Sequence, residues 1–341
     1  LSNDSEKICR RVKWFVGGVM EKIKLSLLQK WKLPEQYSFV HSSALLSDGR
    51  VLILTSETDD SDKYCVLVLS SSDIKKIEIC NCSEDRRNYP VLFRFEEGFG
   101  IIKKGQQCEY YTGDFSSPER LSIKNGDSVL QNIVPKKAQQ RYFQVTSDSS
   151  LIPVCFENNV YYGDARCFAL LEFDITKKYA EWKSFSNIDK KAFTHRNDRR
   201  DETPKIDSLK IANREIYAFL SGESTTSVNK WGMDYYALAK ISADGTVVEK
   251  FLESDNLKQS SKKGGVNGVF TDSDYVVMTP LFKTDEWKGK QKLFSLTVRK
   301  YFDIGLPRGM SKHKVQNISG DSCITSLYNR GLKEVALCKI G

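Results

Sequence analysis

Six pairs of short apolar segments, each pair joined by a tight polar turn, recur along the chain at intervals of about fifty residues. In the first pair, Ala44–Leu46 precedes the turn Ser47–Gly49 and Val51–Leu54 follows it. Short segments rich in Val, Ile, Leu and aromatic residues, bounded by Gly, Asp and Ser, are typical of β-hairpins. The repeat therefore predicts an all-β protein whose units are arranged around an axis. The other five pairs lie at residues 91–102, 142–156, 209–220, 269–278 and 315–328.

A second and less apolar hairpin follows each of the first five pairs. Inner strands of a propeller blade contact neighbouring blades on both sides while outer strands meet solvent, so this gradient is typical of a four-stranded blade. The chain thus resembles a six-bladed β-propeller over nearly its whole length, which implies six four-stranded blades in a single domain, residues 1–341. A parallel β-helix is the structural alternative, but it requires much shorter repeats. The second hairpins lie at residues 64–79, 108–123, 167–185, 235–252 and 292–304.

The sixth unit ends one strand short of four, and residues 12–33 are the candidate for the missing strand. Gly17-Gly18 lies there between apolar alternations, which is a hairpin signal. A basic amphipathic helix on a membrane surface is the alternative for this segment. Each glycine disfavours a helix interior by about 1 kcal/mol. We therefore expect a strand from the N-terminal segment to complete the C-terminal blade and close the ring.

Charge and cysteine content indicate which ligands and which compartment suit the chain. Lys and Arg number 52 against 44 Asp and Glu, and we interpret this excess as spread along the chain, which permits binding to nucleic acid or an anionic membrane without indicating it. Most of the nine cysteines lie in apolar segments, for example Cys65, Cys155 and Cys338. This pattern predicts buried free thiols in a reducing compartment, and therefore a cytoplasmic protein. With three histidines and a single Cys-x-Cys pair, we assign no metal site and no cofactor.

The connections between strands predict which face of the disc binds a partner. In a blade with strands A to D from the axis outward, the A–B and C–D turns lie on one side, and the B–C loops and D–A crossovers on the other. The A–B turns are all tight, whereas several connections on the other side reach the roughly 12–15 residues at which loops are usually functional or disordered. The B–C loops are residues 56–63, 157–166, 221–233 and 282–291, and the crossovers are 81–89, 125–140, 186–206, 253–266 and 305–314.

Aromatic and basic residues in these loops are the candidate binding residues. Aromatic rings with flanking charge are common anchors in protein interfaces and in sugar sites. Rings that cap the apolar space between blades are the alternative interpretation, which applies more to the two tyrosines than to the tryptophans. The candidates are Trp231, Trp287, Tyr161, Tyr162, Arg166 and Lys230.

Catalytic motifs are absent from the sequence: it has no P-loop, no Gly-x-Ser-x-Gly and no His-Glu-x-x-His. Ser242–Thr246 resembles part of the Asp-box of sialidase-type propellers, but it lacks the closing Trp and an Asp-Gly turn explains it equally well. We assign no catalytic residue and predict a non-enzymatic binding module for a protein partner. The alternatives are a carbohydrate-active propeller, either glycoside hydrolase or lectin, and an electrostatic binder of nucleic acid or anionic membrane.

Overall fold

The computed structural model describes fourteen stretches of the chain, and every regular element in them is a β-strand. No helix in these stretches has the length and apolar character needed to cross a bilayer. Residues 138–140, 145–147, 156–158, 164–166 and 205 are described by their backbone alone. The described residues are 21–57, 63–79, 90–96, 98–103, 107–125, 138–140, 145–147, 150–158, 164–189, 192–193, 205–222, 235–254, 265–281 and 287–341.

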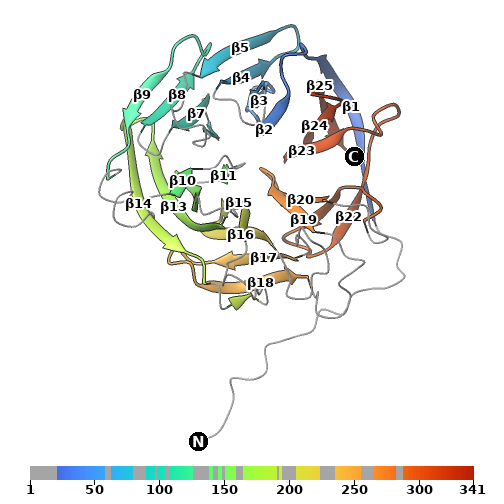
Figure 1. Cartoon of the computed structure of the whole chain (residues 1–341). Coiled ribbons are helices and arrows are strands. Elements are labelled where there is room, and N and C mark those ends of the chain that lie inside the picture. The colour runs from blue at the N-terminus through green and yellow to red at the C-terminus, as the bar shows by residue number, and fades with distance from the viewer. Residues whose placement is uncertain are drawn as a thin grey trace, which may run out of the picture.

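Successive antiparallel sheets follow one another around a central axis (Figure 1). In the first two sheets the strands pair in chain order, as the alternation of apolar segments and turns predicts. The first sheet contains β2 (Phe39–Leu45), β3 (Val51–Ser56), β4 (Tyr64–Leu69) and β5 (Ile74–Ile79). The second contains β6 (Val91–Phe95), β7 (Gly98–Lys103), β8 (Gln107–Thr112) and β9 (Glu119–Ser122).

The next two sheets depart from chain order at one point. Strand β11 (Val145–Ser147) pairs in parallel with β15 and so joins the fourth sheet, although it precedes β12 in the sequence. The third sheet contains β10 (Ala138–Gln140), β12 (Leu151–Asn158), β13 (Asp164–Asp174) and β14 (Tyr179–Asn187). The fourth contains β11, β15 (Lys205–Ala212), β16 (Glu215–Gly222), β17 (Tyr235–Ile241) and β18 (Val247–Glu253).

The last sheet has eight strands because β1 (Lys22–Lys32) joins two groups of strands. Lys22–Lys24 pair in parallel with β22, and Leu25–Lys32 pair antiparallel with β25. The first and last described strands of the chain therefore lie side by side (Figure 1). The order is β19 (Val266–Phe270), β20 (Tyr275–Pro280), β21 (Lys292–Ser295), β22 (Tyr301–Gly305), β1, β25 (Leu332–Ile340), β24 (Ser322–Tyr328) and β23 (Lys314–Ser319).

The predicted all-β, propeller-like arrangement is confirmed, but the strands are grouped differently from six separate four-stranded sheets. The difference arises from the two parallel pairings, β1 with β22 and β11 with β15, each of which extends a sheet beyond four strands. Residues 22–32 form a strand and not the alternative helix: Ile23, Leu25 and Trp31 are buried while the lysines between them are exposed. Gly17-Gly18 lies outside the described residues.

Apolar side chains fill the space between neighbouring sheets. One cluster joins the first sheet to the second, another joins the first to β1 and β25, and a third joins the fourth to the last. The described cysteines are buried and free, as their apolar surroundings predict, and burial raises the pKa of the Cys65 thiol to about 11. These cysteines are Cys65, Cys108, Cys155, Cys167, Cys323 and Cys338.

A polar network near the axis holds the inner strands together. The Arg94 side chain on β6 lies 3.3 Å from the Asp272 carboxylate between β19 and β20. Asn317 on β23 donates hydrogen bonds both to Asp272 (2.9 Å) and to the carbonyl of Ser43 on β2 (3.0 Å). Lys210 on β15 donates to the carbonyl of Thr271 (2.9 Å). Burial raises the pKa of Asp272, while Arg94 and Asn317 oppose that shift. These contacts link strands of four sheets around the buried Asp272 carboxylate.

Two names are used below for the two ends of the strands. The turn end carries the A–B and C–D turns, for example residues 46–50 and 70–73. The loop end carries the other connections. In the last sheet the described loop-end segments are residues 287–291, 306–313 and 329–331, and the segment 33–38 that leads from β1 to β2.

Candidate functional site

Most of the candidate binding residues lie where the structure offers no description. Tyr161, Tyr162, Lys230 and Trp231 are outside the described residues, so their role stays a prediction. Arg166 lies within β13 and not in a loop, because the β12–β13 pairing extends to Asn158 and Asp164. The strands are longer there than the polar sequence suggests. The structure does not bring any two of the six candidates together among the residues that it describes.

Trp287 is buried, which corrects its assignment as an exposed anchor. Its side chain is 2% exposed and packs edge-on against Tyr301, with ring centroids 6.1 Å apart. The Lys292 ammonium lies 4.8 Å from the centre of the same ring. A tryptophan flanked by polar residues in the sequence is thus held in the core by β21 and β22, which no local pattern reveals. Its ring supports the surface above it and does not itself present area to a partner.

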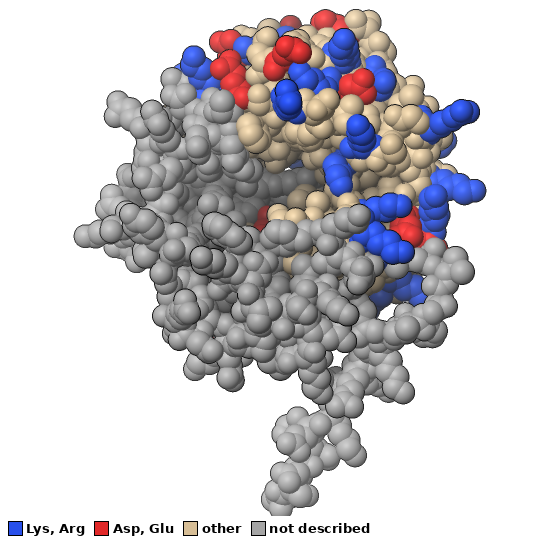
Figure 2. Space-filling view, turned by 45° about the vertical axis from the view of Figure 1, so that its right-hand side comes forward, with Lys and Arg blue, Asp and Glu red and all other residues tan. Residues whose placement is uncertain are grey.

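The positive charge of the chain is concentrated near its C-terminus, in contrast to the interpretation that it is spread. Residues 287–341 contain 11 Lys and Arg against 3 Asp and Glu, whereas the whole chain contains 52 against 44. The first 286 residues therefore hold equal numbers of basic and acidic groups. This segment forms β21–β25 of the last sheet. In Figure 2, Lys and Arg side chains outnumber Asp and Glu along the right-hand edge of the molecule.

Seven of the basic residues form a cluster at the loop end of the last sheet, which we call the loop-end cations. None of them forms an ion pair with another described residue, and all but the half-buried Lys314 are exposed. Several positive charges that form no ion pair with a described residue create a positive potential, which attracts anionic groups. The loop-end cations are Lys32, Lys288, Lys290, Arg308, Lys312, Lys314 and Arg330.

Two of the described carboxylates of this region are already engaged. Glu334 lies 3.3 Å from the Lys30 ammonium and 3.4 Å from His313 Nε2, and Glu35 lies 3.1 Å from Lys333. Burial lowers the pKa of His313, although its contact with Glu334 acts in the opposite direction. Because these acids are held by other groups, they do not neutralise the loop-end cations. The described residues of this surface therefore carry a net positive charge.

Two partly exposed aromatic rings lie beside the loop-end cations. Phe39 is 38% exposed and Tyr328 is 39% exposed. The backbone N–H of Val40 donates a 2.8 Å hydrogen bond to the Tyr328 hydroxyl, which fixes the tyrosine next to the start of β2. Arg330 follows Tyr328 by two residues. Tyr and Arg are the residue types most often found at the energetic centres of protein interfaces. This group was missed from the sequence because Phe39 and Tyr328 are far apart in the chain.

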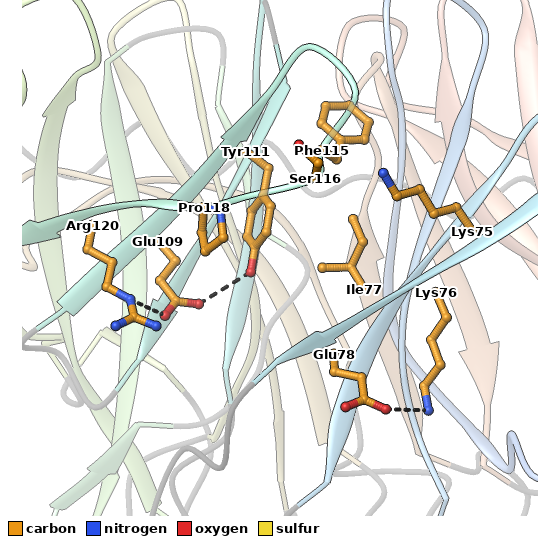
Figure 3. A pocket seen from close by; sticks show the side chains of 10 residues that line it. All are labelled: Lys75, Lys76, Ile77, Glu78, Glu109, Tyr111, Phe115, Ser116, Pro118 and Arg120. Carbon is orange, nitrogen blue, oxygen red and sulfur yellow. Dashed lines mark hydrogen bonds and ion pairs between the residues drawn. The ribbon is translucent and has the colours of Figure 1, made fainter.

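A groove on the outer rim lies between β5 and the β8–β9 hairpin (Figure 3). Its volume is about 320 Å³. Glu109 in its wall is 4% exposed and is held by the Lys103 ammonium at 2.5 Å and by Arg120 Nε at 3.1 Å. The Tyr111 hydroxyl also donates to Glu109 at 3.3 Å. The Glu109 carboxylate is thus engaged by two cations and a hydroxyl at the junction between the first two sheets.

A second cleft, of about 360 Å³, lies at the turn end between the fourth and last sheets. Glu215 lies 2.6 Å from the Lys240 ammonium, and Glu249 lies 2.8 Å from Arg299. The hydrogen bond from Lys240 holds the pKa of Glu215 below its usual range. Glycoside hydrolysis requires a carboxylic acid whose pKa is raised, so Glu215 is unsuited to that role. No group of His, Cys, Asp and Glu among the described residues could hold a metal ion.

Comparisons with known proteins identify no family. No family model matches the sequence, and no curated protein matches it. The chain is similar in structure to BamB from Moraxella catarrhalis at 10% identity, with a TM-score of 0.41 over 92% of this chain and 99% of that chain. It is also similar to the glutaminyl cyclase of Myxococcus xanthus at 10% identity, with a TM-score of 0.36 over 95% of this chain and 100% of that chain. At these TM-scores neither likeness carries an inference about this protein.

Proposed function

We propose that the chain is a non-enzymatic binding module, built as one six-bladed propeller, that binds an acidic region of a protein partner at its loop end. The observation that carries this proposal is the cluster of seven loop-end cations without ion pairs among the described residues. These cations meet a carboxylate-rich partner at little cost, because no ion pair with another described residue has to be broken. Complementary charge of this kind raises the association rate and selects the partner.

The six-bladed architecture rests on the geometry of the eight-stranded sheet. Strands β19–β22 form one four-stranded group, and β23–β25 with β1 form another. Among the described residues, backbone strand pairing joins the two groups only at Lys22–Lys24, whereas β1 pairs with β25 from Leu25 to Lys32. We therefore assign the sheet to two blades in contact, with β1 as the outermost strand of the last blade. Under this proposal residues 1–341 are a single domain closed by strands from both ends. The described free cysteines support the further proposal of a reducing, cytoplasmic location.

A protein partner is favoured over nucleic acid by the aromatic residues at the same surface. Phe39 and Tyr328 each keep more than a third of their area exposed beside Arg330. Their contact area would be buried by an apolar side chain of a partner, while the surrounding cations meet its carboxylates. Protein interfaces combine an aromatic and Arg-rich centre with a polar rim in this way.

The test uses a labelled glutamate–tyrosine copolymer as an acidic polypeptide probe, with affinity measured by fluorescence anisotropy at low and moderate salt. The loop-end variant replaces Lys288, Lys312 and Arg330 with Glu. The matched control replaces three exposed lysines outside the loop end with Glu, and so makes the same change in net charge; these are Lys22, Lys24 and Lys300. We expect the loop-end variant to lose at least about tenfold in affinity, equivalent to 1.4 kcal/mol, and the control to lose less than about twofold.

A further double variant, Phe39→Ser with Tyr328→Ser, separates the partner classes. We expect it to weaken binding of the copolymer and to leave any binding of a duplex DNA probe unchanged. Equal losses in the loop-end variant and its control would refute the proposed site. DNA binding that exceeds copolymer binding and decays steeply with salt would assign the surface to nucleic acid instead. Turnover of chromogenic glycosides would overturn the non-enzymatic assignment.

A further inference from the structure

Strand β1 presents a row of lysines and one leucine on its outward side. Its inward residues Ile23, Leu25 and Trp31 are buried. Side chains of a strand alternate between its two sides, so every second residue of β1 faces solvent. At about 3.3 Å per residue, the outward row extends over roughly 33 Å. The outward residues are Lys22, Lys24, Ser26, Leu28, Lys30 and Lys32, and each of them is exposed.

A β-bulge in the middle of β1 exposes two adjacent leucines. Leu27 pairs with Cys338 and Gln29 pairs with Leu337, so Leu28 is the additional residue that has no partner on β25. Leu27 is 46% exposed and Leu28 is 56% exposed. The inward alternation would otherwise bury Leu27, as it buries Leu25. At the bulge, Leu27 is therefore exposed beside the outward-facing Leu28, and the two form a small apolar prominence.

Neighbouring residues leave this prominence uncovered. The side-chain amide of Gln29 donates to the carbonyls of Ser70 and Ser71, both at 3.1 Å, and Trp31 Nε1 donates to Ser70 at 2.6 Å. The first sheet thus contacts β1 at Gln29 and Trp31, and among the described residues no hydrogen bond joins it to the two leucines. The described structure leaves the leucines as the part of β1 that is both apolar and exposed.

Lysines flank the leucines along the strand. Lys22, Lys24 and Lys32 form no ion pair with another described residue. Lys30 pairs with Glu334 but remains 45% exposed at its side chain. The acidic groups of this rim are Glu21, Asp303, Asp321 and Glu334, of which Asp321 lies 3.7 Å from Lys339.

We propose that the β1 rim docks on an anionic lipid bilayer, with Leu27 and Leu28 inserted among the headgroups and the flanking lysines against lipid phosphates and carboxylates. Stable peripheral attachment requires two contributions, and this rim supplies an apolar one and an electrostatic one. Leucines at the centre of a basic row would have no role on a nucleic-acid backbone. The inference goes beyond the proposed function, and Lys32 is the one residue that the β1 rim shares with the loop-end cations.

The experiment measures cosedimentation of the full chain with phosphatidylcholine vesicles that contain or lack phosphatidylserine. We expect binding only to the vesicles with phosphatidylserine. Leu27→Ser with Leu28→Ser should reduce the partition coefficient at least about tenfold, and Lys22→Glu with Lys24→Glu should do the same. Val248→Ser is the matched control, because Val248 is 58% exposed on the outer strand β18 beside Glu249 and not in a basic row. It should bind as the unmodified chain does.

Three results would overturn this inference. They are failure of the unmodified chain to bind either vesicle, unchanged binding after the leucine substitutions, and an equal loss in Val248→Ser. The substituted side chains are exposed, so thermal melting of each variant should match the unmodified chain and exclude misfolding as the cause. The loop-end variant Lys288→Glu, Lys312→Glu and Arg330→Glu should retain vesicle binding. That result separates failure of this inference from failure of the proposed function.

Discussion

Acidification from about pH 7 to about pH 5 should destabilise the fold through His41. This side chain on β2 is 9% exposed, and its Nε2 lies 2.6 Å from the Ser56 hydroxyl on β3. Its ring also contacts Tyr64 on β4, with centroids 5.2 Å apart. Burial lowers the pKa of His41 from 6.5 to about 4, because the charged imidazolium would lose its hydration among these strands. The folded protein therefore keeps His41 neutral where an unfolded chain would protonate it.

The sign and size of the effect follow from this pKa difference. Between its unfolded pKa of 6.5 and its folded pKa of about 4, His41 binds more protons in the unfolded state, so stability falls as the pH falls through this range. Each unit of difference between the unfolded and the folded pKa corresponds to about 1.4 kcal/mol of stability. Because pH 5 lies about 1.5 units below the unfolded pKa, most of the stability that corresponds to those 1.5 units is lost at pH 5. We expect a loss of about 2 kcal/mol from His41 between pH 7 and pH 5.

Urea unfolding at several pH values, with and without His41→Gln, isolates this contribution. Glutamine keeps a polar group near Ser56 but does not titrate. The free energy of unfolding of the unmodified chain should therefore fall by about 2 kcal/mol relative to that of His41→Gln from pH 7 to pH 5. Burial also lowers the pKa of His313, but that residue is present in both proteins and cancels in the comparison. Parallel stability curves over this range would refute the reasoning, as would an NMR titration of His41 near its ordinary pKa.

Two further predictions concern packing and ring closure. Trp287→Ala should lower the free energy of unfolding by about 3–5 kcal/mol, because the ring is buried, while Val248→Ala at an exposed position should change it by less than about 0.5 kcal/mol. Urea unfolding checks both, and a loss below about 1 kcal/mol for Trp287→Ala would restore the ring as a candidate contact. Removal of residues 1–32 should expose the edge of β25 and cause aggregation or a large drop in melting temperature. An unchanged melting temperature would contradict closure of the ring by β1.

Sequence patterns predicted the strands well where apolar residues and turn signals coincide. Val51–Leu54 and Tyr64–Leu69 are almost wholly buried strands, and their composition alone identifies them. The patterns were less informative where a strand depends on a distant partner. Arg166 was assigned to a loop because its neighbours are polar, whereas backbone pairing with β12 places it in β13. Hydrogen bonding to an adjacent strand stabilises polar residues that have no intrinsic strand signal.

The sequence by itself determined the all-β class, the burial of the described cysteines and the total charge, because these depend on residue type and on short-range order. Tertiary structure alone decided that β1 lies against β25, that Trp287 is buried, and that Phe39 and Tyr328 share a surface. It also decided which loop-end cations form no ion pair with another described residue. Each of these outcomes depends on contacts between segments far apart in the chain, which closure of the ring brings together and which no local pattern encodes.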